Sequence, residues 1–197
     1  MARSARGGSR SDHGSSVRVG IRRECPRAAE PISASLIVRI RQAQVHDVDE
    51  LVALVNAAFA VEQFFVPGPR ISRDGIVAQM ARGVFLVAES GAKTVGCVFV
   101  NRAIPAGYMG LLSVAPDHQG QGIGKRLVEA AERSCREAGC SSIEIRVVNL
   151  RSELPPFYRG RGYAERGTEP FDGPTPTIPC HFVLMAKNLD SPEGMVS

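Results

Sequence analysis

Three glycines at alternate positions stand where a helix is expected to begin. Gly120, Gly122 and Gly124 lie in the run "APDHQGQGIGKRL", which connects an apolar strand-like segment to an amphipathic helical one. Because glycine has no Cβ, its backbone can approach an anion closely and adopt unusual dihedral angles. The first amides of a helix lack acceptors within it, and the helix dipole adds partial positive charge there. The pattern indicates a loop that binds phosphate, with a ligand-free glycine turn as the alternative.

The spacing excludes two common phosphate-binding motifs. A dinucleotide-binding fingerprint requires G-x-G-x-x-G, and here Lys125 directly follows the third glycine. A P-loop requires a glycine well before its G-K-[ST] group, where this chain has Gln119, and Arg126 replaces the Ser or Thr. Neither kind of nucleotide site is therefore expected.

A third match extends beyond the glycines. Val114 and Pro116 precede the run from Gln119 to Gly124, and "LLSVAPDHQGQGIGKRL" resembles the acetyl-CoA-binding motif of the GNAT (GCN5-related) N-acetyltransferase superfamily. Further along, "VVNLRSELPPFYRGRGY" resembles the segment that closes the cofactor cleft in that family. The order of expected elements between about residues 36 and 189 also matches the family's order.

The resemblance implies a binding mode for acetyl-CoA. Backbone amides from Gln119 to Lys125 would hold the pyrophosphate, and strand residues 112–114 would pair with the pantetheine arm as another strand does. Lys125 and Arg126 could add charge toward the phosphates or form the solvated face of a helix. The implied cofactor-binding residues are Leu112, Ser113, Val114, Gln119, Gly120, Gln121, Gly122, Ile123, Gly124, Lys125, Asn149 and Tyr158.

Acetyl transfer to an amine also requires acid–base chemistry. An ammonium, with a pKa of about 10.4 if it is lysine-like, has no lone pair until it loses a proton. A strand amide near Leu112 is expected to stabilise the oxyanion. Tyr158 matches the family's tyrosine near the sulfur of CoA, where it can protonate the departing thiolate; the alternative is an aromatic packing role. Asn149 matches an asparagine that orients this region or a bound water.

The general base is harder to assign. Many family members carry a carboxylate on the strand before the loop, but "GYMGLLSVA" has none. Glu89, Glu62 and His181 are candidates, each with a structural role as the alternative, and deprotonation through water would need no dedicated side chain. His118, inside the loop, is expected to be structural.

The acceptor site is expected in two segments outside the cofactor motif, residues 59–70 and 167–182. Arg70, with Arg151, could bind a carboxylate of the substrate, whereas the acidic residues Glu169 and Asp172 would suit a polyamine. The leading hypothesis is N-acetylation of a small primary amine by direct attack in a ternary complex. The alternatives are a protein or peptide N-acetyltransferase and a non-catalytic module that senses acyl-CoA.

Hydrophobic periodicity predicts the elements that position these residues. Strands are expected at 36–43, 84–90, 94–102, 108–115, 142–149 and 180–189, with a short one at "YAERG". Helices are expected at 46–60, 72–83 and 124–139, with a short helix or turn at "LPPFYRGRG". This order predicts an α+β domain on a largely antiparallel sheet. The resemblance implies a single GNAT-like domain with a mixed, mostly antiparallel, twisted sheet of six or seven strands, flanked by about four helices, whose splayed central strands hold acetyl-CoA.

Composition narrows the classes of function. The hydrophobic share of 44% and the charged share of 22% are ordinary for a globular protein, and no apolar run approaches the length of a membrane span. Seven arginines and three acids in residues 1–35 account for the whole net charge of +4, so residues 36–197 are neutral overall and give no charge-based case for nucleic acid. Five cysteines without a CxxC pair predict neither disulfides nor a metal site and favour a reducing cytoplasm.

The chain is expected to contain one folded unit. Residues 1–35, rich in Arg, Ser and Gly, are predicted to be a disordered basic extension, either a targeting segment or the product of a misassigned start. Residues 36–189 form the predicted acetyltransferase domain, and residues 190–197 a flexible tail. A homodimer is compatible with the sequence, which does not fix the oligomeric state.

Overall fold

The computed structural model describes residues 38–190; the prediction for residues 1–35, and that for the tail 190–197 beyond Asp190, lie outside them. The described residues build a seven-stranded sheet in the order β1-β2-β3-β4-β5-β7-β6. The strands are β1 (Val38–Gln42), β2 (Val84–Ser90), β3 (Lys93–Asn101), β4 (Ala106–Val114), β5 (Ser142–Val148), β6 (Ala164–Pro170) and β7 (His181–Asn188). The α-helices are α1 (Val48–Ala58), α2 (Arg73–Met80), α3 (Ile123–Glu137) and α4 (Leu154–Arg159), and short 3-10 turns are η1 (Val45–Asp47), η2 (Phe59–Glu62) and η3 (Pro116–His118).

The sheet is mixed but mostly antiparallel. Every neighbouring pair runs antiparallel except β4 and β5, which are parallel and connected through α3. This arrangement confirms the predicted fold class and the predicted order of elements. The predicted helix over 46–60 is divided into η1, α1 and η2, because the chain tightens to 3-10 geometry at both ends of α1.

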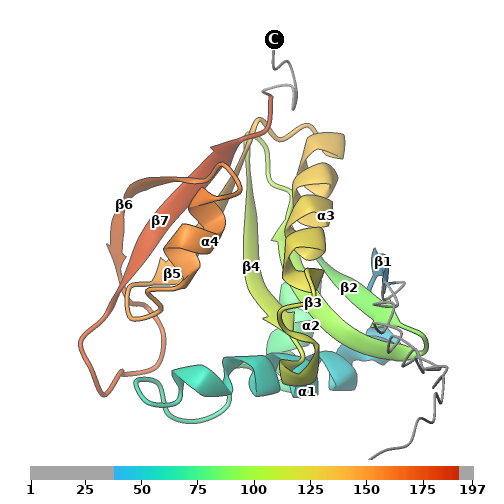
Figure 1. Ribbon diagram of the computed structural model, residues 1–197, viewed down its shortest axis with the longest axis horizontal. Coiled ribbons are helices and arrows are strands. Elements are labelled where there is room, and N and C mark those ends of the chain that lie inside the picture. Colours follow the sequence, from blue (N-terminus) through green and yellow to red (C-terminus); the bar gives the residue numbers. More distant parts are fainter. Residues whose placement is uncertain (1–37, 191–197) are drawn as a thin grey trace, which may run out of the picture. The chain divides into compact units, whose positions relative to one another are not determined.

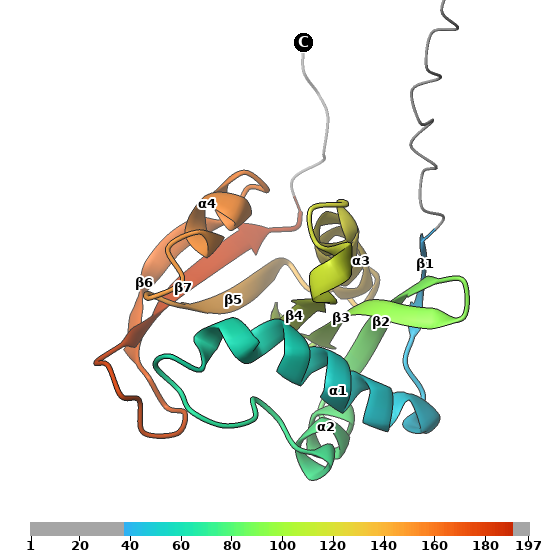
Figure 2. The ribbon, with the colours of Figure 1, turned by 60° about the horizontal axis from the view of Figure 1, so that its bottom comes forward.

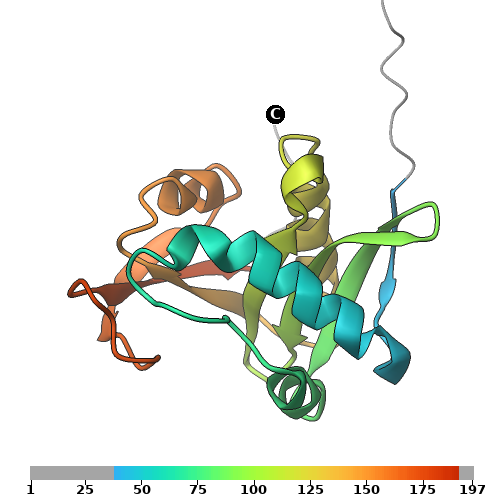
Figure 3. The same cartoon turned by 90° about the horizontal axis from the view of Figure 1, so that it is seen from below.

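The helices lie on both faces of the sheet, with α1 and α2 on one side and α3 and α4 on the other (Figure 3). Alternation along the strands produces two cores, because successive strand residues point to opposite faces. In β3, Val98 and Val100 face α3, whereas Cys97 and Phe99 face α1. We call these sides the α3 face and the α1 face.

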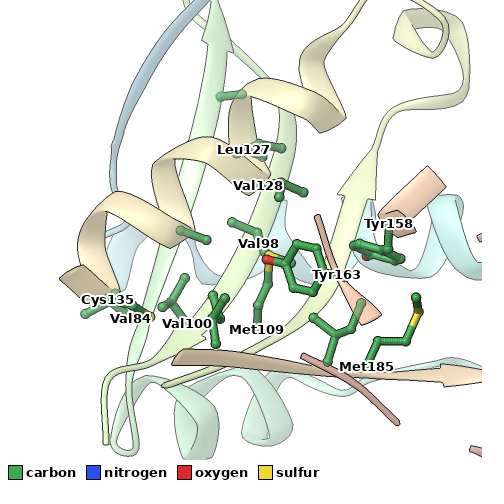
Figure 4. Packing of buried hydrophobic residues seen from close by; sticks show 14 of the residues in the cluster. Val84, Val98, Val100, Met109, Leu127, Val128, Cys135, Tyr158, Tyr163 and Met185 are labelled. Carbon is green, nitrogen blue, oxygen red and sulfur yellow. The ribbon is translucent and has the colours of Figure 1, made fainter. Parts of the chain in front are cut away.

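Helix α3 packs against the sheet through one apolar stripe. Leu127, Val128, Ala131 and Cys135 are buried and recur at steps of one, three and four residues, as expected for one side of an α-helix. Figure 4 shows Leu127 and Val128 over the strands, beside Val98. Burying a Leu or Val side chain contributes about 1.5–3 kcal/mol, so this stripe fixes the helix and the loop that precedes it.

A β-bulge interrupts β4 in the middle of the sheet. Leu111 has a φ of 51°, and the register with β3 shifts between Gly110 and Ser113. The Ser113 hydroxyl donates a hydrogen bond to the Leu111 carbonyl over 3.1 Å. The bulge changes the alternation, so that Leu112 and Val114 pack on the α3 face while Leu111 packs on the α1 face.

Strands β4 and β5 diverge after a short parallel seam. The seam pairs Ala106 with Ser142, Gly107 with Ile143 and Tyr108 with Glu144, and no further pair joins the two strands. Figures 1 and 2 show β5, β7 and β6 turning away from β4, with α4 beside β5. The predicted splayed central strands are therefore present.

The described residues contain neither a membrane-spanning helix nor a cluster of metal-binding side chains. Between residues 38 and 190, no helix is long and apolar enough to cross a bilayer. In the same range, no group of three or more His, Cys, Asp or Glu side chains could hold a metal ion, and Cys97, Cys135, Cys140 and Cys180 are all unpaired thiols.

Candidate active site

A cavity of about 670 Å³ lies where β4 and β5 separate. Its lining includes residues from both faces of the sheet, because Leu112 and Ile145 belong to the α3 face while Tyr108 and Leu111 belong to the α1 face. The cavity therefore passes through the sheet and can bring two ligands together from opposite sides. Its volume is typical of a small-molecule site.

The glycine loop forms the wall of the cavity on the α3 face. Gly120 and Gly122 have φ values of 75° and 78°, in the left-handed region that favours glycine. A Cβ at either position would meet no atom within 4 Å, so the space beside the loop is open to a ligand. Gly122 is also the N-cap of α3 and offers no side chain to its first-turn amides. These amides therefore remain available to an anion.

The glutamine side chains of the loop form hydrogen bonds within the loop and to the end of β4. The Gln119 amide donates to the Val114 carbonyl over 3.1 Å, and the Gln121 amide donates to the Asp117 carbonyl over 3.3 Å. Arg126 donates to the carbonyl of Val38 on β1, which holds its guanidinium against the sheet. The backbone of the loop, and not Arg126, is therefore the group that can meet phosphate.

An apolar slot continues from the loop along the splayed strands. It is formed by Leu112 and Val114 of β4, Val147 of β5, and Leu154 and Phe157 of α4. An anion cradle that opens into a narrow apolar slot fits the pyrophosphate and pantetheine of acetyl-CoA. Beyond Tyr108 the backbone of β4 has no strand partner on this side, as the expected pairing with pantetheine requires.

Tyr158 lines the cavity from α4 and is only 6% exposed. Its ring lies edge-on to Phe157 and Tyr163, at centroid distances of 5.0 and 5.5 Å, and Figure 4 shows it beside Tyr163. Burial raises the pKa of the Tyr158 hydroxyl well above its usual range, so the phenol stays protonated at neutral pH. Tyr158 can therefore act as a proton donor inside the cavity.

Glu62 contributes a buried carboxylate to the cavity. It lies in η2 with 7% of its surface exposed and accepts a hydrogen bond from Arg151 Nη1 at 2.7 Å. Arg151 also donates through Nε to Glu153 at 2.6 Å. Burial raises the pKa of Glu62 despite the positive charges of Arg70 and Arg151. Of the carboxylates named from the sequence as candidate bases, Glu62 lies at the cavity.

The other candidate bases lie elsewhere. Glu89 is on β2 and accepts from Arg41 Nε at 2.7 Å, outside the cavity lining. His181 begins β7 with an exposed side chain, and its backbone amide donates to Asn149 Oδ1 at 2.9 Å. Asn149 therefore fixes the end of the β5–β7 pair and is not among the lining residues. Ser113 and Gln121 are likewise not in the lining.

Sequence reasoning missed several residues on the α1 face of the cavity. Tyr108 and Arg146 come from strands, and Phe182 from the start of β7. Arg146 is bound to Asp172 at 2.9 Å, and its guanidinium lies 4.1 Å from the Phe182 ring centroid. A usable signal was present in "IEIRVV", because a charged residue inside a strand needs water, a partner or a cavity beside it.

Comparison with known proteins agrees with this geometry. Residues 81–165, which include the glycine loop and Tyr158, match a family described as Acetyltransferase (GNAT) domain. The chain is 34% identical over 115 residues to N-acetyltransferase family 8 member 2 of Rattus norvegicus, an alignment that covers 55% of this chain and 46% of the relative. It is 33% identical over 94 residues to an IAA acetyltransferase of Azospirillum brasilense, which covers 47% and 61% of the two chains.

Solved structures share the fold. The yncA protein of Salmonella typhimurium, solved with its cofactor acetyl-CoA, superposes with a TM-score of 0.65 at 18% identity, over 80% of this chain and 96% of that one. The resemblance to GNAT acetyltransferases is therefore confirmed over residues 81–165 by the family model, and the fold of the described residues is shared with solved acetyltransferase structures. The chain spans less than two thirds of the length of the curated relatives it matches.

Proposed function

We propose that this protein is an acetyl-CoA-dependent N-acetyltransferase that acetylates the primary amine of a small molecule by direct attack in a ternary complex. The observation that carries the proposal is the cavity through the sheet, with a backbone anion cradle on one face and a buried carboxylate reached from the other. When bound, acetyl-CoA supplies the acetyl group and the thiolate leaving group.

Glu62 is the group best suited to remove a proton from the amine. A general base works best when its pKa lies near the working pH, and burial moves the pKa of Glu62 in that direction. Arg151 holds the carboxylate in one orientation at 2.7 Å. The amine therefore meets a fixed acceptor for its proton, directly or through one water molecule.

Two further groups complete the proposed chemistry. The bulge at Leu111 turns the local backbone of β4, and the amide of Leu112 is our candidate for stabilising the negative charge that develops on the carbonyl oxygen. Tyr158, whose phenol lines the cavity and is protonated at neutral pH, is our candidate for protonating the thiolate. A thiol with a cysteine-like pKa of about 8.5 leaves more easily when such a donor is present.

A small acceptor is favoured because two loops that supply lining residues on the α1 face of the cavity are hydrogen-bonded to each other. The Thr177 amide donates to the Phe65 carbonyl over 2.8 Å, and the Thr177 hydroxyl donates to the Phe64 carbonyl over 3.0 Å. These bonds join segments 59–70 and 167–182 into a cover beside Glu62. An enclosed site suits a compact amine better than an extended polypeptide.

The four unpaired thiols among residues 38–190 support a reducing compartment, and we propose the cytoplasm.

The test combines binding and turnover with the full chain. Isothermal titration with acetyl-CoA, followed by a thiol-release screen over amines, is expected to show binding and then amine-dependent release of CoA thiol. Binding without thiol release on any amine would favour a module that senses acyl-CoA. The absence of binding would overturn the proposal.

A matched pair of glycine variants tests the cradle. Gly122→Val places a branched side chain at positive φ beside the open space, and we expect the dissociation constant of acetyl-CoA to rise about 100-fold. Gly91→Val is the control, because Gly91 also has a positive φ of 63° and open surroundings but lies in the β2–β3 turn. Both variants carry a similar backbone penalty of about 1–2 kcal/mol, so equal affinities would remove the loop from the site.

A further inference from the structure

The charges on the α1 face of the cavity are unequally paired. Arg151 is bound to Glu62 and Glu153, and Arg146 lies close to Asp172 at 2.9 Å and Glu169 at 3.4 Å. Arg70 lines the same cavity, and among the described residues no carboxylate forms an ion pair with it. Arg70 is therefore the arginine at this end of the cavity that has no carboxylate bound to it among the described residues.

Arg70 is held in place but lacks a partner for its donors. Its guanidinium carbon lies 5.1 Å from the centroid of the Phe59 ring, and its Nε is buried without a hydrogen-bond partner. A buried donor that is left unsatisfied is unfavourable, and a guanidinium matches a carboxylate with two parallel hydrogen bonds. The geometry of Arg70 is that of a receptor for a carboxylate of the ligand.

Arg70 and Glu62 lie close enough to influence one another. The charge of Arg70 is the strongest electrostatic effect that opposes the burial-driven rise in the pKa of Glu62. A ligand whose carboxylate binds Arg70 would therefore place a neighbouring group beside Glu62. The α-amino group of an amino acid, two bonds from its carboxylate carbon, is such a neighbouring group.

The acidic residues of segment 167–182 do not favour a polyamine as the acceptor. Glu169 and Asp172 are both engaged by Arg146, so neither offers an unmatched carboxylate to a second ammonium group of a polyamine. Phe59 and Phe182 supply apolar surface beside the three arginines. This surface suits an apolar side chain on the acceptor.

We propose that the acceptor is a zwitterion, a free amino acid with an apolar side chain, whose carboxylate binds Arg70 and whose amine faces Glu62. This inference rests on the proposed acetyltransferase function and specifies the substrate class for that site. The ammonium of the zwitterion first loses one proton through Glu62 to solvent. The amine nitrogen then forms a bond to the acetyl carbon, the carbon–sulfur bond of acetyl-CoA breaks, and the second proton lost by the nitrogen is balanced by the proton gained by the thiolate.

The first test compares matched amines in the thiol-release assay with the full chain and acetyl-CoA. L-phenylalanine is compared with phenylalaninamide, phenethylamine and spermidine, and the standard amino acids are then screened. We expect kcat/KM for the preferred amino acid to exceed that for its amide at least about 100-fold. The amide is a stringent control, because an α-amino group beside an amide has a pKa of only about 7.7–8.0 and is more often unprotonated at neutral pH.

The second test changes the receptor. We expect Arg70→Met to lower the ratio of kcat/KM for the amino acid to that for its amide about 100-fold, mainly through KM for the amino acid, and to leave the affinity for acetyl-CoA within about threefold of the unmodified chain. Arg70→Lys keeps the charge without the planar fork and is expected to fall between the two. Because the amine comparison uses the unmodified chain, it stands even where a variant folds poorly.

The outcomes separate the two proposals. Equal or faster turnover of neutral amines, amides or spermidine would overturn the zwitterion inference and leave the acetyltransferase function intact. An Arg70→Met variant that still prefers the amino acid would overturn the assignment of Arg70. Failure of every amine to release thiol, with or without binding of acetyl-CoA, would overturn both.

Discussion

Two clusters in this molecule have the same composition, one arginine with two carboxylates, but opposite properties. Arg41 on β1 binds Asp47 and Glu89 at 2.7 Å each, and Arg151 after β5 binds Glu62 and Glu153 at 2.7 and 2.6 Å. In the first cluster the pKa of the buried carboxylate is lowered, and in the second it is raised. An arginine with two carboxylates therefore does not by itself indicate function. The number of hydrogen bonds that each carboxylate accepts, and its burial, must also be known.

The difference has a clear physical origin. Asp47 accepts two hydrogen bonds from Arg41 and one from the Gln44 amide, and the bonds from Arg41 lower its pKa to about 2 against the effect of burial. Glu62 accepts one bond from Arg151 among the described residues, and burial raises its pKa. A carboxylate saturated with donors stabilises a fold, whereas one with spare acceptor capacity at a cavity can take a proton.

The largest expected effect tests Glu62. We expect Glu62→Gln to lower kcat about 1000-fold with little change in the affinity for acetyl-CoA, because the amide cannot accept the proton. In the unmodified chain, kcat/KM is expected to fall as the pH drops through the raised pKa of Glu62, above the usual range for a glutamate. Stopped assays over a pH series, with the unmodified chain and with Glu62→Gln, measure this fall in kcat/KM at low pH.

Glu153→Gln and Glu89→Gln are the matched controls for Glu62. The first removes the other, 61% exposed carboxylate of Arg151, and the second removes a carboxylate of the Arg41 cluster. Both are expected to keep kcat within about threefold, since neither side chain is proposed to take part in proton transfer. A loss with Glu153→Gln as large as that with Glu62→Gln would show that the orientation of Arg151, and not the base, is responsible.

A smaller loss of kcat is expected from removing Tyr158, the proposed general acid. Burial raises the pKa of Tyr158 as it does that of Glu62, which leaves the phenol protonated and able to donate. We expect Tyr158→Phe to lower kcat about 100-fold while KM for both substrates changes little, because a thiolate can still leave without a donor. Single-turnover measurements test this, and an unchanged kcat would remove Tyr158 from the chemistry.

The smallest expected effect on activity belongs to the Arg41 cluster. A carboxylate whose pKa is lowered in the folded state contributes stability above its unfolded pKa, and it loses that contribution as the pH falls toward the folded value of about 2. We expect Asp47→Asn to reduce the free energy of unfolding by about 2 kcal/mol at pH 7 and much less at pH 2, with kcat unchanged. Urea unfolding at several pH values measures the difference, and equal losses at pH 7 and pH 2 would contradict the linkage.

The cofactor loop could be located from the sequence, and on the acceptor side the sequence indicated segments 59–70 and 167–182 with Arg70 and Glu62, but not the strand residues that join them. The loop depends on local backbone geometry, and Gly120 and Gly122 report that geometry directly. The α1 face of the cavity is assembled from η2, β5 and the start of β7, so Glu62, Arg146 and Phe182 line one cavity only after the sheet forms. The sequence alone gives no reason to prefer Glu62 over Glu89 as the base. The structure does, because Glu62 lines the cavity and Glu89 does not.

The short seam between β4 and β5 has a consequence for the lifetime of the protein. Beyond Tyr108, β4 is paired with β3 but not with β5. On our proposal the pantetheine arm of acetyl-CoA pairs with this free edge. A ligand that binds only the folded state adds about 2.7 kcal/mol of stability at 100 times its dissociation constant. The fraction of unfolded chain, and with it susceptibility to proteases, would then follow the supply of acetyl-CoA, which makes the amount of this enzyme sensitive to the carbon status of the cell.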